Sequence, residues 1–321
     1  MLTTLQPNVL PSALDGVLSS LTKELARDEN TRLIIAVDYD GTLTPIVKNP
    51  SEALLNPKVR QTIAGLSSLG NVHIIISSGR SRTALEKFVT LTPTPQTPQS
   101  EARWGGLSYS TSHGFLIDGP FGVLDNASHS ASALKAAAAQ ISRCVQEAGD
   151  SLTGVTIEIA PACITGHYRN AIDEKSAERS LDHIFNVAAA AHNLERRSAK
   201  KAFEVRGRPA NGETWNKGSA LKWILAQLTD KEGGPPVVVL AIGDDETDED
   251  LFEAANTAAT LQQVANAWSV RVFGASDDRP TRATLSLKDP KEVATLLENV
   301  LIKMGGHKML ETGSPNIDTK L

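Results

Sequence analysis

Three short apolar runs stand out along the chain, and each ends in small and polar residues. They are Leu33–Val37, Val72–Ile76 and Val237–Ile242. Unbroken runs of this length are typical of strands buried on both faces, as in a parallel sheet. Segments with helical spacing of apolar residues, such as 11–30, separate them. This order predicts an α/β fold with a doubly wound, Rossmann-like parallel sheet, whose ligands bind beyond the carboxyl ends of the strands.

The middle of the chain has a different pattern. Segments 131–148 and 177–195 have the spacing of helices, and a set of short segments has the pattern of strands: 155–159, 164–169 and 202–206. Because these elements interrupt the parallel-sheet pattern, we expect a smaller α+β domain inserted at 120–205. The parallel-sheet domain then comprises 1–119 and 206–305.

Two further segments show no periodic pattern. Residues 91–100 are rich in Pro, Thr and Gln, which predicts an exposed loop. The polar end of the chain, 306–321, is expected to be a flexible tail.

Composition narrows the class of protein. The chain has 321 residues, of which 40% are apolar, enough for one large or two modest domains. No apolar run is long enough to cross a membrane, and the N-terminal residues lack the pattern of a secretory leader. The two cysteines, Cys144 and Cys163, do not make a disulfide framework, so we expect a cytoplasmic protein.

Charge argues against a nucleic-acid partner. Lys and Arg number 32 against 37 Asp and Glu, a net charge of −5, and the basic residues do not gather into one stripe. Binding through phosphate neutralisation along a nucleic acid needs such a basic surface.

The first apolar run is followed by two carboxylates, in the segment Asp38-Tyr39-Asp40-Gly41-Thr42. Asp38 and Asp40 lie two positions apart, so along a strand they point to the same side. Adjacent anions suit an oxygen-seeking cation such as Mg²⁺. A carboxylate can also attack phosphorus, while a second one protonates the leaving alcohol and then deprotonates water. A polar turn after a strand is the alternative reading of this segment alone.

The ends of the other two runs add compatible groups. Ser78 and Gly79 lie between an expected strand and the start of an expected helix, where backbone N–H groups favour anions. A simple N-terminal cap of the helix is the alternative interpretation of these two residues. The segment 243–250 is strongly acidic. It is either a solvated loop or a cation site, and it lacks the sixth-position glycine of an EF-hand. Lys217 precedes a helix expected to start near Ser219, and on its own it is more simply explained as a surface lysine.

Together these segments place an aspartate pair, a hydroxyl, a lysine and distal carboxylates in a fixed chain order. In this the sequence resembles the haloacid dehalogenase superfamily of phosphatases, over 34–252. The resemblance implies that Asp38 is the nucleophile and Asp40 the acid/base. It adds Thr42, Ser78 and Lys217 as groups that stabilise charge on the phosphate. It implies Mg²⁺ bound by Asp38, Asp244 and the backbone carbonyl of Asp40. Asp245 and Asp248 are expected just outside, with direct binding of the metal by either one left open.

A finer resemblance is to trehalose-6-phosphate phosphatases. It rests on the segments 38–46, 78–80, 112–114, 216–218 and 243–252. The resemblance implies trehalose 6-phosphate as substrate, the last step of trehalose biosynthesis as the reaction, and possible association with trehalose-6-phosphate synthase. It implies that the insert at 120–205 is a cap that recognises the sugar. The substrate contacts that follow are Arg80, His113, Glu158, Arg169, Asn170, Lys200 and Glu204.

The chain departs from that family at two places. Ala160 stands where the family often has a lysine, and residues 207–213 separate Arg206 from Trp215 where a proline usually follows directly. Two alternatives remain open at this point: another capped sugar-phosphate phosphatase or phosphomutase, and a sugar-phosphate sensor without turnover. The Asp38 and Asp40 pair argues against the sensor, which has no need of an acid/base carboxylate.

Overall fold

The computed structural model describes residues 10–47, 49–92, 104–199, 201–210, 212, 214–229, 234–273 and 279–305. The chain forms two compact units. The first unit comprises Met1–Val123 and Asn216–Leu321, and the second unit, Leu124–Trp215, is inserted into it. Most of the expected loop 91–100 and the whole expected tail 306–321 lie outside the described residues.

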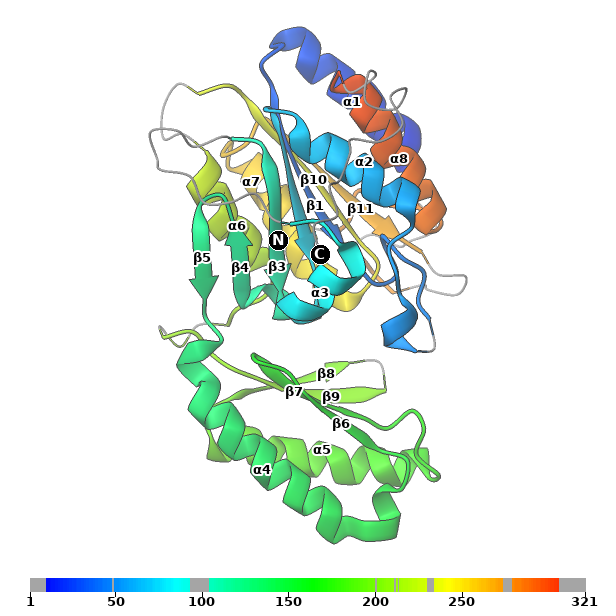
Figure 1. Ribbon diagram of the computed structural model, residues 1–321, viewed down its shortest axis with the longest axis vertical. Coiled ribbons are helices and arrows are strands. Elements are labelled where there is room, and N and C mark those ends of the chain that lie inside the picture. The colour runs from blue at the N-terminus through cyan, green and yellow to red at the C-terminus, as the bar shows by residue number, and fades with distance from the viewer. Residues whose placement is uncertain are drawn as a thin grey trace, which may run out of the picture. The chain divides into compact units, whose positions relative to one another are not determined.

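The first unit is built on an eight-stranded sheet with the order β12-β11-β10-β1-β2-β3-β4-β5 (Figure 1). The strands from β12 to β3 run parallel, and β4 turns back antiparallel to β3. Their bounds are β1 Arg32–Asp38, β2 Val72–Ser77, β3 Gly106–Thr111, β4 Leu116–Gly119, β5 Gly122–Asp125, β10 Val237–Gly243, β11 Asn266–Val272 and β12 Leu285–Leu287.

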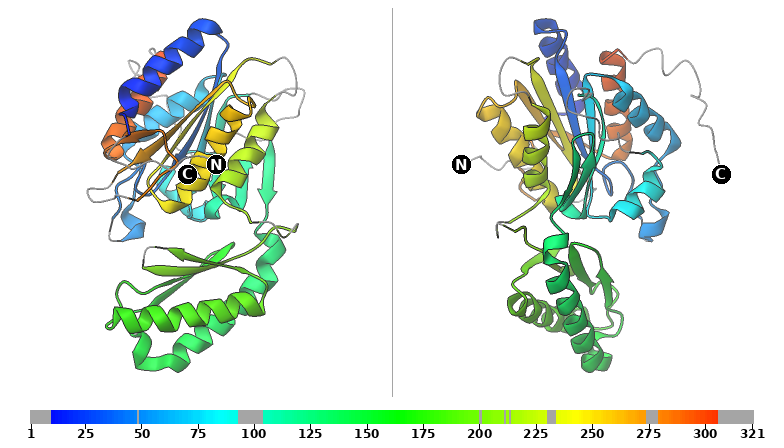
Figure 2. Two further views of the ribbon diagram at one scale, coloured as in Figure 1. Left: turned by 180° about the vertical axis from the view of Figure 1, so that it is seen from behind. Right: turned by 60° about the vertical axis from the view of Figure 1, so that its left-hand side comes forward.

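Helices cover both faces of this sheet. Figure 2 shows, in its edge-on right-hand view, α6 and α7 on one side and α2, α3 and α8 on the other. The helices are α1 Ala13–Arg27, α2 Pro57–Ser68, α3 Arg82–Val89, α6 Lys217–Leu228, α7 Glu249–Thr260 and α8 Pro290–Lys303, with short 3₁₀ turns η2 Pro50–Glu52, η4 Ser112–Gly114 and η7 Glu246–Asp248.

The alternation along β1 explains why both faces need a cover. Leu33, Ile35 and Val37 pack into the core that α1, α2 and α8 share. Ile34 and Ala36 point to the opposite face, because successive side chains of a strand alternate. All five are buried. Asp38 falls on the same face as Ile34 and Ala36.

The second unit has a four-stranded antiparallel sheet, with the order β6-β7-β9-β8. One face packs on two helices through Ile164, Phe203 and Val205. Glu204 and Arg206 alternate with these residues and therefore lie on the other face. The bounds are β6 Thr156–Ile159, β7 Cys163–His167, β8 Glu195–Ala199, β9 Ala202–Arg206, α4 Ala131–Ala148 and α5 Glu174–Ala191, with turns η5 Ser128–Ser130 and η6 Gly149–Leu152.

The structure confirms the predicted fold class and the three buried parallel strands, which are β1, β2 and β10. One predicted helix, 177–195, is wrong at its end. The helix α5 stops at Ala191, Asn193 adopts a left-handed φ of 53°, and Glu195 already begins strand β8. The charged residues of β8 hide its strand pattern. Within the described residues, no helix is both long and apolar enough to cross a membrane.

Candidate active site

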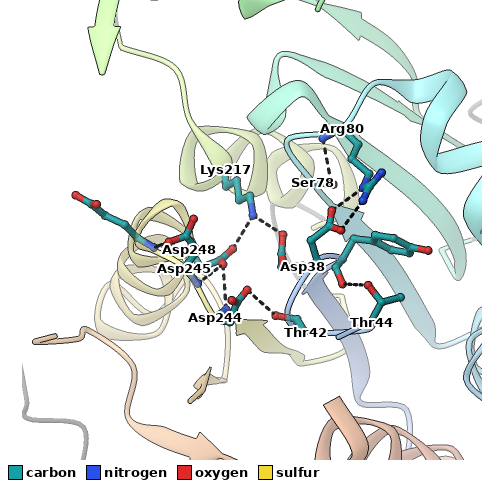
Figure 3. A network of polar contacts seen from close by, with 12 residues as sticks. Asp38, Thr42, Thr44, Ser78, Arg80, Lys217, Asp244, Asp245 and Asp248 are labelled. Carbon is teal, nitrogen blue, oxygen red and sulfur yellow. Dashed lines mark hydrogen bonds and ion pairs between the residues drawn. The ribbon is translucent and has the colours of Figure 1, made fainter. Parts of the chain in front are cut away.

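The common direction of the parallel strands brings three polar segments together at the carboxyl ends of neighbouring strands. Asp38 ends β1, Ser78 follows β2, and Asp244 follows β10. Since β1 pairs with β2 on one side and with β10 on the other, these segments are neighbours (Figure 3). Residues far apart in the sequence therefore meet at the carboxyl ends of the strands, as the sequence predicts.

Lys217 joins two of the carboxylates at the centre of this cluster. Its Nζ donates to Asp38 Oδ1 at 2.6 Å and to Asp248 Oδ1 at 2.8 Å. All three side chains are buried. Lys217 is the first residue of α6, and the side chain of Asn216 caps that helix by accepting from the N–H of Ser219. The helix thus begins two residues earlier than expected, which fixes the backbone of Lys217.

Burial and charge together perturb the acid–base properties of this cluster. Burial raises the pKa of Asp38 well above its ordinary value, and the attraction of Lys217 opposes this only in part. Burial and the charges of Asp248 and Asp245 raise the pKa of Asp244 to about 7. For Lys217, burial lowers the pKa, but the two carboxylates outweigh it and raise the pKa above the ordinary value. Lys217 is therefore a permanent cation.

Asp248 organises the acidic loop. Its Oδ1 accepts from Lys217, and its Oδ2 accepts from the backbone N–H groups of Asp244 and Asp245, each at 3.1 Å. Thr42 Oγ1 donates to Asp244 Oδ1 at 3.4 Å. The loop that follows β10 is in this way tied both to Lys217 and to the loop that follows β1.

The cluster has the composition of a divalent cation site. Asp38, Asp244 and Asp248 each offer a carboxylate oxygen, and these oxygens lie within 4.8 Å of one another. One lysine faces three carboxylates, so negative charge is left over, and oxygen ligands of this kind suit a hard cation such as Mg²⁺. The residues present therefore fit a metal ion. Asp248 already uses both oxygens, which leaves Asp38 and Asp244 as the better ligands.

Asp245 joins this cluster through its backbone N–H, while its side chain makes other contacts. Its Oδ1 accepts from the N–H of Glu246 at 2.7 Å and lies 3.4 Å from Arg279 Nη1, and its side chain is exposed. It is expected just outside the metal, which stays a prediction; in the structure its side chain caps η7 and pairs with Arg279 at the surface.

Asp40 and Arg80 form a two-pronged ion pair. Arg80 Nε donates to Asp40 Oδ2 and Nη2 donates to Asp40 Oδ1, both at 2.6 Å. The resemblance implies that Arg80 contacts the substrate. In the structure its guanidinium holds the carboxylate expected to act as acid and base.

The turn η4 packs against the turn that carries Ser78. The carbonyl of Ser78 accepts from the N–H of His113 at 2.9 Å, and Ser78 Oγ accepts from the N–H of Arg80 at 3.1 Å. His113 has a left-handed φ of 58°, which places its ring against Gly79, where a Cβ would lie 2.5 Å from His113 Nε2. His113, expected to contact substrate, therefore packs on the turn that carries Ser78.

The remaining candidates belong to the second unit. Glu158 lies on β6 and Glu204 on β9, and both point to the face of the sheet away from α4 and α5. Arg169 and Asn170 are exposed in the turn that follows β7. Lys200 lies outside the described residues.

Sequence reasoning missed three charged residues on that same face. Arg206 donates through Nε to Glu204 Oε2 at 2.7 Å, and Arg197 donates through Nε to Glu195 Oε1 at 2.8 Å. Arg197 is the register partner of Glu204. The alternation of 195–199 is the signal that would have found Glu195 and Arg197, had the segment been assigned to a strand.

The chain combines a Rossmann-like core that holds an inserted second unit with an aspartate–lysine–aspartate cluster at the ends of β1 and β10. These features define a phosphatase of the haloacid dehalogenase superfamily. The trehalose-phosphatase family model matches residues 36–291 of the chain. The chain belongs to the trehalose-phosphatase family, and it is a phosphate-ester hydrolase.

Individual relatives agree with this placement. The chain is 28% identical over 299 residues to "Probable trehalose-phosphate phosphatase D" of Arabidopsis thaliana, covering 91% of this chain and 72% of that protein. A solved trehalose-6-phosphate phosphatase of Aspergillus fumigatus is 26% identical, with a TM-score of 0.59 and coverage of 91% and 99%. The C-terminal domain of the C. albicans enzyme, 23% identical with a TM-score of 0.67 and coverage of 92% and 98%, shares the fold.

Proposed function

We propose that the chain hydrolyses trehalose 6-phosphate to trehalose and phosphate through an aspartyl-phosphate intermediate on Asp38, the final step of trehalose biosynthesis. The observation that carries the proposal is the placement of Asp38. It ends the central strand β1, it is buried, and Lys217 holds one of its oxygens at 2.6 Å. Family membership supplies the substrate class.

The reaction then has two steps. A carboxylate oxygen of Asp38 attacks phosphorus, the bond from phosphorus to the sugar oxygen breaks, and Asp40 gives a proton to that oxygen. In the second step water attacks the phosphorus of the aspartyl phosphate, Asp40 takes the proton from the water, and phosphate leaves as the carboxylate of Asp38 is restored. Asp40 thus ends each cycle as it began.

Charge stabilisation is the main contribution of the site to such a transfer. Lys217 brings a fixed positive charge to Asp38, and its raised pKa keeps that charge across the physiological range. Ser78 and Thr42 are buried hydroxyl groups at the ends of β2 and β1. We assign all three to the phosphoryl oxygens.

We assign a Mg²⁺ ion to Asp38, Asp244 and the backbone carbonyl of Asp40. When bound, the ion neutralises the charge that accumulates on the phosphoryl group. The chain's own part is to present two carboxylates, fixed by Lys217 on one side and by Thr42 on the other.

Sugar recognition is assigned to the second unit, corresponding to the domain expected at 120–205. The face of its sheet away from α4 and α5 carries paired donors and acceptors, such as Arg206 with Glu204, the arrangement that a polyol needs. The assigned residues are Glu158, Arg169, Asn170, Lys200 and Glu204. Two further assignments are a cytoplasmic location, from two cysteines that are both free, and association with trehalose-6-phosphate synthase, from family membership.

The experiment that tests this function is phosphate release from a panel of sugar phosphates. Wild type should prefer trehalose 6-phosphate, and Asp38→Asn should lose essentially all turnover while keeping its fold. Asp15→Asn, an exposed aspartate of α1, is the control and should behave as wild type. Equal rates on glucose 6-phosphate would remove the substrate assignment. Full activity of Asp38→Asn would remove the covalent mechanism, and transfer of phosphate between sugars would favour a mutase.

A further inference from the structure

Arg80 is held in place from several directions. Its guanidinium carbon lies 4.7 Å from the ring centroid of Phe88 and 5.7 Å from that of Tyr39. Its N–H donates to Ser78 Oγ, and its carbonyl accepts from the N–H of Ser112 at 2.9 Å. The side chain is only 15% exposed. Backbone, ring contacts and burial therefore leave the guanidinium little freedom.

The two nitrogens that form the fork of this arginine are both used on Asp40. Nε and Nη2 each lie 2.6 Å from a different oxygen of the carboxylate. A bidentate pair of this geometry fixes the plane of the carboxylate as well as its distance, which a single lysine cannot do. An arginine that served the sugar would instead keep these donors available for hydroxyl groups.

We propose that Arg80 is a positioning residue for the carboxylate of Asp40 and does not bind the sugar. The two-pronged pair is the ionised form of Asp40, the form that takes a proton from water in the second step. When Asp40 carries the proton for the leaving oxygen, the protonated oxygen releases its contact and the other oxygen keeps the second contact with Arg80. The proposal deepens the proposed function and depends on the role of Asp40 in it. As a consequence, the turn after β2 would serve two groups of the reaction. Ser78 would bind the phosphoryl oxygens, and Arg80 would orient the carboxylate of Asp40.

The leaving group distinguishes this role from a structural or sugar-binding one. A sugar or phenol oxygen is a basic leaving group and needs a proton as the bond breaks, whereas p-nitrophenolate leaves readily without one. General acid catalysis contributes about 10²–10⁴-fold where it is needed. A misplaced Asp40 should therefore slow phenyl phosphate much more than p-nitrophenyl phosphate, and neither ester has sugar contacts to lose.

The experiment compares kcat for these two esters in wild type, Arg80→Ala and Asp40→Asn. Arg80→Ala should widen the ratio of the two rates at least about tenfold, in the direction of Asp40→Asn. Added guanidinium ion should bring the ratio of the two rates in Arg80→Ala back towards the wild-type value. The rings of Phe88 and Tyr39, which contact the guanidinium of Arg80, remain in place to bind the added ion. In the double variant, Arg80→Ala should add little to Asp40→Asn, since residues that act as a unit are not additive.

The matched control is Arg82→Ala. Arg82 is also largely buried, and its guanidinium lies 4.5 Å from the ring centroid of Tyr109. It pairs with Asp118, with Nη2 3.0 Å from Oδ2. Its loss should affect stability without changing the ratio of the two rates. If Arg80→Ala does not fold, Arg80→Lys gives the same test, because lysine keeps the charge but not the fork.

Three results would overturn the proposal. They are an unchanged ratio in the Arg80 variants, additive losses in the double variant, and a raised KM for trehalose 6-phosphate with kcat unaltered. Failure of the proposed function looks different. Wild type would then ignore trehalose 6-phosphate, while the effect of Arg80 on the two aryl esters would stand.

Discussion

The carboxylate of Asp244 occupies the space that a side chain on Gly41 would fill. A Cβ at Gly41 would lie 2.2 Å from Asp244 Oδ2, and the backbone there has a φ of 91°, which other residues rarely adopt. The loops that follow β1 and β10 thus approach each other through a glycine. This close approach is what brings Asp244 within reach of Asp38 and Thr42.

Gly41→Ala should therefore reduce activity far more than it reduces stability. The left-handed backbone costs about 1–2 kcal/mol for a residue with a Cβ, but displacing Asp244 by an ångström should lower kcat/KM by about 100-fold. Steady-state kinetics and urea unfolding measure the two effects. Gly212→Ala is the control, because Gly212 has a φ of 73° with nothing within 4 Å of an added Cβ. Similar activity losses in both variants would contradict the explanation.

Asp244 and Asp245 should respond differently to loss of charge. Asp244→Asn removes a carboxylate from the proposed cation site and should raise the Mg²⁺ concentration needed for half-maximal activity by at least about 100-fold. Asp245→Asn changes an exposed side chain paired with Arg279, so its effect should stay below about threefold. Titration of activity with Mg²⁺ after treatment with EDTA provides the measurement. Wild-type activity that survives EDTA would exclude the metal.

Glu204 should affect the sugar substrate selectively. A truncated contact leaves a sugar hydroxyl without its partner at about 1–3 kcal/mol, or one to two decades in kcat/KM. Glu204→Ala should therefore lower kcat/KM for trehalose 6-phosphate by that factor and leave p-nitrophenyl phosphate nearly unchanged. Glu178→Ala is the control, since Glu178 lies on α5, where it accepts a hydrogen bond from Tyr168 on the other side of the sheet. Parallel losses on both substrates would mean that Glu204 only supports the fold.

His73 should make the protein sensitive to acid. It is fully buried, its Nε2 lies 2.8 Å from Ser108 Oγ, and Trp104 and Phe121 flank its ring. Burial lowers the pKa of His73 from 6.5 to about 4. In the unfolded chain the imidazole takes up its proton first as pH falls. The stability that the neutral ring provides is therefore complete above pH 6.5 and is lost as the pH falls towards 4.

The loss in the free energy of unfolding that is due to His73 should amount to about 3 kcal/mol, because each unit of pKa difference corresponds to 1.36 kcal/mol. Urea unfolding at several pH values between 7.5 and 4, without divalent cations, measures it for wild type and His73→Gln. The difference between the two proteins should change by that amount across the range. A constant difference would show that His73 does not titrate with folding.

The parts of the fold that the sequence predicts are those with a local signal. Leu33–Val37 and Val237–Ile242 are unbroken apolar runs, and their register partners in the sheet are each other. Strands such as β8 and β12 carry mixed or very short patterns, so only tertiary contacts identify them. Segment 195–199 shows this well, since two adjacent arginines follow a glutamate and no apolar residue marks the buried face.

The residues of the candidate site also fall into those that the sequence predicts and those that it does not. Asp38, Lys217 and Asp244 are predictable because each belongs to a motif at the end of an element. The partner of Arg80 is not predictable, because Asp40 lies forty positions earlier and nothing in either segment shows that the guanidinium points back to it. The charged face of the sheet in the second unit can be predicted only once the alternation of β9 and β8 is known. Orientation within the site therefore comes from packing.

The order of strands also bears on how the chain is made. Strands β1 and β10 are neighbours at the centre of the sheet, yet the whole second unit is synthesised between them. Until β10 leaves the ribosome, the apolar edge of β1 has no partner, and unpaired edges of this kind promote aggregation. The second unit contains all four strands of its own sheet and can form earlier. Lys217 and Asp244 are added only with the late segment, so an incomplete chain carries Asp38, the proposed nucleophile, without the rest of the proposed site.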